Sequence, residues 1–409
     1  MECINLFKYD LTEYRRQKKK ERMKTYSGFR KSQVISSLIK EIKENHLLSA
    51  CHRCVELHIS NFVPEMLHKI ICFVGKSFNV SNPRLPEFLW KRICYLDKLS
   101  TLYTQTENIQ SMRNVLCEIV CVLTFSPKKP IETILKLTID DLRKKNIMHQ
   151  CRAPADWKCS IWHQDDPPFL ENAIKEFSWG ITTMYNKTMS AFEHSFFWLS
   201  VLFFLNKETK KKTKQSIECR ARVIPNIEIK HLTSYIWMIW LILLHEAKVR
   251  EQNNSRYHLL HTHIESLFHL FCYNFKISFL STRMSLVIQA TKILCNFKPL
   301  SYQSSVYLEY ELTMKTVLHI NHLYYELNKY PMNEDDVPIE PFKILIVEDD
   351  TGSFYETKQR PELTIRKNIT KPTPEPINWK EQATTNFITN KSTPRPVVHS
   401  STPRPVVHS

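Results

Sequence analysis

Cysteine and histidine residues occur in this sequence at several spacings that a metal ion could use. Cys51 and Cys54 have a metal-ligand spacing, but no second pair follows at the distance found in zinc fingers. The pair also lies in a stretch that we expect to be helical. A second group falls in an irregular stretch, and its spacing matches no common zinc module: His149, Cys151, Cys159 and His163. We predict no bound metal, and this second group is the candidate if zinc is present.

Further histidines cluster at His258, His261, His263 and His269. On a helix, the three-residue step from His258 to His261 would place both side chains on one face. No carboxylate stands at a familiar metal-motif spacing. We therefore interpret the cluster as a polar or interfacial helix face.

The tripeptide Gly75-Lys76-Ser77 resembles the end of a phosphate-binding loop. The complete motif needs a glycine five residues before Gly75, on a turn between a strand and a helix. That position is Ile70, inside an apolar helical run. A backbone without those glycines cannot wrap its amide groups around phosphates, so we predict no nucleotide site. We also find no Ser-His-Asp or Cys-His arrangement, and we predict no catalytic residue, no cofactor and no enzyme activity.

Basic residues give the strongest functional signal. The formal net charge of +16 fits a polyanionic partner such as nucleic acid or an anionic membrane surface, although it could also serve solubility alone. A basic run near the N-terminus could neutralise phosphates, act as a nuclear import address, or be a solvated tail. It contains Arg15, Arg16, Lys18, Lys19, Lys20, Arg22 and Lys24. A second cluster, Lys210, Lys211 and Lys212, lies in the polar insert 207–214, which we expect to be a phosphate-contacting loop between two helices.

Helices are the elements that must position these residues. Only four glycines occur in 409 residues, and a chain so poor in glycine has few means of building tight hairpins. An A+T-rich genome would bias the composition in the same direction. Apolar residues recur at three- and four-residue steps, as at Val34, Leu38 and Ile42, which is typical of an amphipathic helix. We predict an all-α fold whose helices are joined by proline, asparagine and serine breaks.

The longest apolar runs are Phe196–Leu205 and Tyr235–Leu244. Each has about half of the roughly 20 residues that a membrane span requires, so we expect buried core helices and no membrane partner. The N-terminal residues lack the basic and then apolar pattern of a signal peptide. We therefore expect an intracellular, cytosolic or nuclear, protein with reduced cysteines.

The chain divides into four predicted parts. Residues 1–31 form a basic lead, 32–150 a first helical domain, 151–330 a second helical region, and 331–409 a tail. Within 131–170 we expect one more helix and then an irregular stretch. The tail is rich in proline and ends in two copies of STPRPVVHS, a composition typical of disorder.

Residues 32–129 resemble the helical C-terminal part of the RarA/MgsA family of clamp-loader-like AAA+ ATPases. Ser49–Ser60 is similar to a family helix of the form A-L-x-W-x-x-x-L-x-x-S-G, and Leu67–Val74 followed by Asn82-Pro83 is similar to a later segment. Gly75-Lys76-Ser77 replaces the acidic Ser-Glu-Asp of the family, and we interpret it as a diverged turn. Stand-alone versions of this part, without the ATPase, occur in large DNA viruses and phages.

The resemblance implies an α-helical collar domain that packs subunits into an oligomer and serves DNA replication or repair. It implies no catalytic residue. We therefore expect a viral or virus-derived accessory protein, located in a host nucleus or a cytoplasmic virus factory, that binds DNA and forms a homo-oligomer. It either works without an ATPase or borrows a separate replication ATPase as a partner. Two alternatives remain open: an assembly scaffold of a large DNA virus, and an enzyme of unrecognised helical type that uses the 149–163 cluster.

Overall fold

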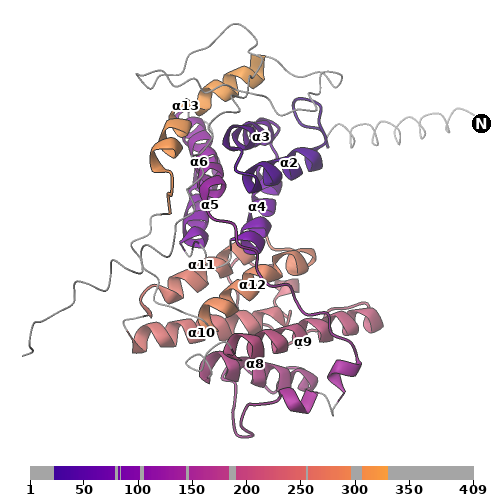
Figure 1. Cartoon of the computed structure of the whole chain (residues 1–409). Helices are drawn as coiled ribbons and strands as arrows, with labels where there is room; N and C mark the ends of the chain where they lie inside the picture. The colour runs from indigo at the N-terminus through magenta and orange to yellow at the C-terminus, as the bar shows by residue number, and fades with distance from the viewer. Residues whose placement is uncertain are drawn as a thin grey trace, which may run out of the picture. The chain divides into compact units, whose positions relative to one another are not determined.

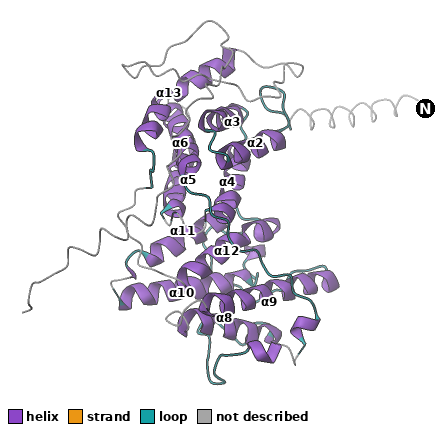
Figure 2. Cartoon of the chain, in the orientation of Figure 1, coloured by secondary structure: helices purple, strands orange, loops and turns teal. Residues whose placement is uncertain are grey.

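The computed structural model describes residues 23–78, 82, 84–101, 106–143, 147–183, 190–254, 257–295 and 306–329. Within these ranges the chain forms eleven α-helices and short 3-10 turns, and no β-strand (Figure 2). The prediction of an all-α fold is thereby confirmed. The basic run from Arg15 to Arg22 and the predicted tail 331–409 lie outside the described residues.

Six helices form a first group, drawn from indigo to purple, with its last member in orange (Figure 1). They are α2 (Lys31–Lys43), α3 (Leu47–Ile59), α4 (Val63–Ser77), α5 (Leu85–Thr101), α6 (Thr106–Phe125) and α13 (Tyr310–Lys329). α3 packs against α2 and α6, and α13 returns from far along the chain to cover α6 and α3. The apolar stripes predicted the buried faces, since Val34, Leu38 and Ile42 of α2 are all buried.

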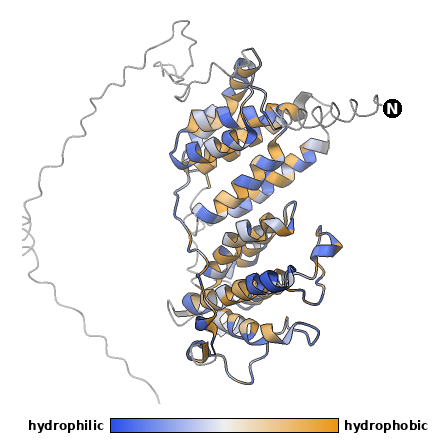
Figure 3. Cartoon of the chain, turned by 90° about the vertical axis from the view of Figure 1, so that its right-hand side faces the viewer, coloured by the Kyte–Doolittle hydropathy of each residue, from blue (hydrophilic) through white to orange (hydrophobic). Residues whose placement is uncertain are grey.

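The remaining five helices form a second group around α12. They are α8 (Glu171–Thr183), α9 (Ser190–Thr213), α10 (Ile236–Asn253), α11 (Leu260–Cys272) and α12 (Leu280–Cys295). α12 is buried on nearly every side, as expected of a helix at the centre of a bundle. It contacts α8, α9, α10 and α11, and also α4 of the first group. Hydrophobic and hydrophilic positions share the same helices throughout (Figure 3).

Asparagines take over a role that glycine usually has at helix ends. Asn45, Asn61, Asn226 and Asn274 have positive φ angles of 63°, 59°, 60° and 45°. Asparagine tolerates this left-handed region better than most residues, because its short side chain can bond locally. Asn45 and Asn61 follow the ends of α2 and α3 directly, so a chain with few glycines can still turn sharply between helices.

Two glycines inside helices mark close helix contacts. A methyl group added at Gly75 would lie 2.6 Å from Ser285 Oγ of α12, and one added at Gly180 would lie 2.5 Å from Ser195 Oγ of α9. Gly75 therefore permits the approach of α4 to α12. The interpretation of Gly75-Lys76-Ser77 as a diverged turn is wrong, because these residues form the last turn of α4.

Two further predictions about local structure are corrected. The stretch 207–214 is not a loop, because α9 continues to Thr213 and only Lys214 leaves the helix, with a φ of 63°. The helix expected within 131–170 is replaced by short 3-10 turns and extended chain. α13 lies in the predicted second region but packs on the first group. No helix in the described part of the chain has the length and apolar character needed to cross a membrane.

Candidate functional sites: a buried thiol cluster and a lysine-rich helix end

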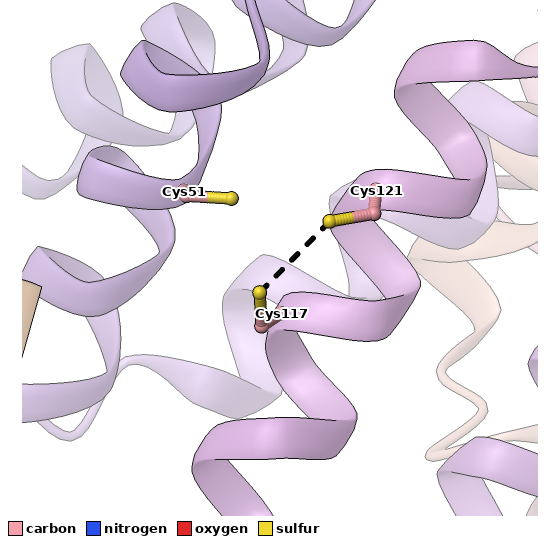
Figure 4. Close-up of side chains that lie close together, drawn as sticks. All are labelled: Cys51, Cys117 and Cys121. Carbon is pink, nitrogen blue, oxygen red and sulfur yellow. Dashed lines mark hydrogen bonds between the residues drawn. The ribbon is translucent and has the colours of Figure 1, made fainter. Parts of the chain in front are cut away.

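Three thiols from two helices meet inside the first group. Cys51 comes from α3, while Cys117 and Cys121 come from α6, one helical turn apart on the same face (Figure 4). The three Sγ atoms all lie within 4.8 Å of one another, and those of Cys117 and Cys121 are 3.9 Å apart. None of the three residues is more than 1% exposed. We call these residues the thiol cluster.

A fourth cysteine and a tyrosine adjoin the thiol cluster. Cys54 lies one turn after Cys51 on α3, is 2% exposed, and its Sγ is 4.0 Å from the carbonyl oxygen of Leu116. Tyr324 of α13 is also buried and forms a hydrogen bond with Nδ1 of His58. The cluster is therefore enclosed by α3, α6 and α13.

The thiols of the cluster perturb one another. Hydrogen bonds from Cys117 and Cys51 lower the pKa of Cys121, and hydrogen bonding with Cys121 raises the pKa of Cys117. Hydrogen bonds with the other two thiols likewise raise the pKa of Cys51, and burial adds to this effect. Burial raises the pKa of Cys54 to about 12. The three thiols therefore titrate as one coupled group.

A second candidate site lies on the surface, at the C-terminal end of α9. Residues 207–214 carry five lysines and one glutamate. Lys207, Lys210 and Lys211 follow the three- and four-residue steps that bring side chains to one helix face. They are exposed, as are Lys212 and Lys214. Lys211 pairs with Glu208 at 2.5 Å. The amide of Lys214 bonds to the carbonyl oxygen of Lys210, and Asn206 anchors the returning chain through Ile217, so the lysines stand on an ordered helix end.

Buried charges in the second group have structural partners. Arg250 pairs with Glu246 at 2.7 Å and also donates to the carbonyl oxygens of Leu294 and Ile181. These carbonyls lie in the last turns of α12 and α8. Carbonyl oxygens in the last turn of a helix have no hydrogen-bond donor within that helix. His194 lies 3.2 Å from Glu176, and both side chains are 2% exposed. Such pairs hold helices together and leave little access for a substrate.

An irregular segment is fastened to the second group by one carboxylate. Asp166 is 1% exposed, accepts hydrogen bonds from the amides of His163 and Arg220, and pairs with Arg222 at 2.6 Å. This buried anchor explains why residues 147–170 are ordered although they form no α-helix.

The predicted zinc candidates lie in this irregular segment but do not converge. His149 is exposed, the Sγ of Cys151 contacts the carbonyl oxygen of Ile147 at 3.5 Å, and Nδ1 of His163 pairs with Asp165 at 3.2 Å. Burial raises the pKa of Cys159. Among the described residues, the groups of three or more close metal-ligand side chains do not include these four.

The remaining predicted residues within the described ranges are Lys24 and the histidines between 258 and 269. Lys24 is exposed and its backbone pairs with Arg30 in an isolated bridge. His258 precedes α11, so it does not share a helix face with His261 as predicted. His261 and His269 flank Glu265 at 3.9 Å and 3.8 Å, which the sequence interpretation had not considered.

The sequence did not predict the thiol cluster, because Cys51 lies far along the chain from Cys117 and Cys121. Cys51 and Cys54 were judged to lack a second pair, and α6 supplies one in space. The signal was present in the sequence as two cysteines four residues apart, Cys117 and Cys121, within the apolar stripe of a predicted helix. Sequence alone gives no rule for which helices pack together, so this pair could not be joined to Cys51.

Comparisons with known proteins return no match. No protein-family model matches the sequence, no curated protein matches it, and no solved structure matches the fold.

Proposed function

We propose that this protein binds nucleic acid, DNA in the first instance, as a non-catalytic accessory factor of replication or repair. The observation that carries the proposal is the lysine-rich end of α9, where five lysines within eight residues accompany a single glutamate. The net charge of +16 favours a polyanionic partner in the same way. The resemblance of residues 32–129 to a clamp-loader collar supports DNA as that partner.

The spacing of these lysines suits a phosphate backbone. Side chains three and four residues apart on a helix have Cβ atoms about 5–6 Å apart, which is close to the separation of successive phosphates along a strand. Each phosphate neutralised on duplex DNA lowers the slope of log K against log salt by about 0.9. Contacts from Lys207, Lys210 and Lys211 would therefore account for a slope of roughly 2–3.

Charge reversal at the helix end tests this proposal. We expect the triple variant K207E/K210E/K211E to bind a duplex of random sequence at least tenfold more weakly and to show a salt slope reduced by roughly 2–3. Fluorescence anisotropy over a salt series measures both quantities. The matched control is K43E/K98E/K315E, which changes the same net charge at exposed lysines on three separate helices. Equal losses in both variants would show that only the overall charge matters.

The basic run from Arg15 to Lys24 belongs to the same proposal as a second phosphate contact. Reversing its charge should lower DNA affinity and flatten the salt dependence independently of α9. If binding is unchanged, the run has another role, such as an import signal. Oligomerisation through the helical body and cooperation with a separate replication ATPase are parts of this proposal that the collar resemblance suggests.

An assembly scaffold is the second candidate function, and one surface favours it. Leu318 and Tyr325 of α13 are 77% and 61% exposed and lie seven residues apart, on the same helix face. Exposed apolar side chains grouped in this way mark protein interaction surfaces. Light scattering should show L318E/Y325E with a lower mass than the unaltered protein if the face joins subunits.

A further inference from the structure

We propose that the thiol cluster binds one thiophilic metal ion, zinc or copper(I), with Cys51, Cys117 and Cys121 as ligands. Cys54 is the nearest candidate for a fourth ligand. Nothing in the nucleic-acid proposal depends on this ion, and its failure would leave the lysine end of α9 untouched. The inference rests on where three sulfur atoms lie and on what else surrounds them.

The separations of the sulfur atoms suit a single ion. Two sulfur ligands at about 2.3 Å from a tetrahedral zinc ion are about 3.8 Å apart. The Sγ atoms of Cys117 and Cys121 are already 3.9 Å apart, and that of Cys51 lies within 4.8 Å of both. Small rotations of the Cys51 side chain would complete a three-sulfur site. An iron–sulfur cluster would require its cysteine sulfurs to lie further apart than this.

Helical geometry makes the ligand set rigid. The four-residue step on α6 places Cys117 and Cys121 on the face that packs against α3, and Cys51 approaches from α3 opposite them (Figure 4). Cys54 lies one turn along α3, and its Sγ is 4.0 Å from the carbonyl oxygen of Leu116, so a change of its side-chain rotamer would be needed before it could act as a fourth ligand. Facing helices commonly build metal sites from side chains of this kind.

The three proposed ligands are all thiols, and this determines which metal ions the site would favour. Thiolates are soft ligands that favour zinc and copper(I) over magnesium or calcium. On binding, the three thiols give up their protons to solvent, and with zinc the site then carries one negative charge. Arg113 lies one turn before Cys117 on α6, and its guanidinium covers the ring of Tyr324 at 4.3 Å from the ring centroid.

Buried cysteines elsewhere show that burial alone does not produce such a cluster. Cys219 and Cys295 are 7% and 3% exposed, and the Sγ of Cys295 donates to the hydroxyl of Ser195 at 3.7 Å. Neither belongs to a group of three close ligands within the described part of the chain. They are the natural controls, since they share the chemistry and the burial of the thiol cluster but not its convergence.

Metal analysis of the full-length protein tests the proposal. The protein is purified under reducing conditions without chelators, and zinc and copper are measured per chain by mass spectrometry. We expect about one equivalent of either metal in the unaltered protein, in C219S and in C295S, and less than one fifth of that in C117S and C121S. Equal metal content in all four variants would overturn the proposal. The absence of zinc and copper from the unaltered protein would overturn it as well.

A measurement without variants covers the case in which C117S or C121S does not fold. The metal is removed from the unaltered protein with a chelator under reducing conditions, and cobalt(II) is added. We expect a sulfur-to-cobalt charge-transfer absorption that saturates at one equivalent and disappears when zinc is added. No such band, or a disulfide joining Cys51 to Cys117 or Cys121 in the freshly purified protein, would contradict the assignment.

Discussion

The two helical groups of this molecule each bury a distinct kind of polar cluster. In the second group, buried charges come in pairs, such as Arg250 with Glu246, and they also bind the free ends of neighbouring helices. In the core of the first group the thiol cluster brings like groups together, three sulfur atoms within 4.8 Å. The paired charges neutralise each other within the fold, whereas the converging thiols supply the soft donors for the metal ion that we propose. Burial in the second group therefore goes with neutralised charge, whereas burial in the thiol cluster goes with unpaired soft donors.

Breaking a pair in the second group should have the largest effect. Replacing Arg250 with methionine leaves the buried Glu246 without its cationic partner, although Thr182 Oγ1 still donates to it, and removes the donor to two helix-end carbonyls. We expect a loss of about 3–5 kcal/mol in the free energy of unfolding, measured by urea denaturation. Arg220→Met is the matched control, because the Arg220 side chain is exposed, and it should cost less than about 0.5 kcal/mol. Similar losses in both variants would remove the structural role given to Arg250.

The next largest effects are expected at the two helical glycines, Gly75 and Gly180, which lie at close contacts between helices. Gly180→Ala and Gly75→Ala should each cost about 1–3 kcal/mol through overpacking. The cost should be greater at Gly180, where the added methyl meets His194 Cδ2 at 2.7 Å, while at Gly75 the second contact is Leu286 Cδ2 at 3.0 Å. His194 is held against Glu176, whereas a leucine side chain can move.

Removing the nearest obstacle tests the reason for this order. Ser285→Ala should recover most of the stability lost in Gly75→Ala, because Ser285 Oγ is the closest atom there. Ser195→Ala should recover less in Gly180→Ala, since His194 remains in the way. Equal recovery in the two double variants would contradict this explanation of the helix contacts.

Acid should affect the first group through two histidines, His58, which is buried, and His68, which is half-buried. Burial lowers the pKa of His58 and of His68 from 6.5 to about 4. The unfolded chain therefore binds protons near pH 6.5 that the native protein does not bind until about pH 4. The stability that the neutral histidines contribute is complete above pH 6.5 and is lost as the pH falls through this window.

The variant His58→Gln should make the dependence of stability on pH shallower between pH 7 and 4.5, because glutamine does not titrate. Urea denaturation at a series of pH values measures the slope. His319→Gln changes an exposed histidine of α13 and serves as the control, with a slope close to that of the unaltered protein. A slope unchanged by His58→Gln would show that other groups carry the acid response.

The periodicity of apolar residues predicted much of the helical structure. Contacts between distant segments of the chain could not be predicted in this way. The stripe of Val34, Leu38 and Ile42 predicted the buried face of α2. The polar composition of 207–214 predicted a loop. Lysine is a good helix former, and α9 continues to Thr213. The thiol cluster depends on the packing of α3 against α6, which no local pattern encodes.

Hydrogen exchange with and without a thiol-directed chelator tests the contrast between the two groups most directly. If an ion holds the thiol cluster together, its removal should speed amide exchange at least tenfold in α3, α6 and α13 and leave α8, α9 and α10 unchanged. Unchanged exchange in α3 and α6, or an equal increase in both groups, would contradict the claim that the first group is organised around a metal-bound thiol cluster.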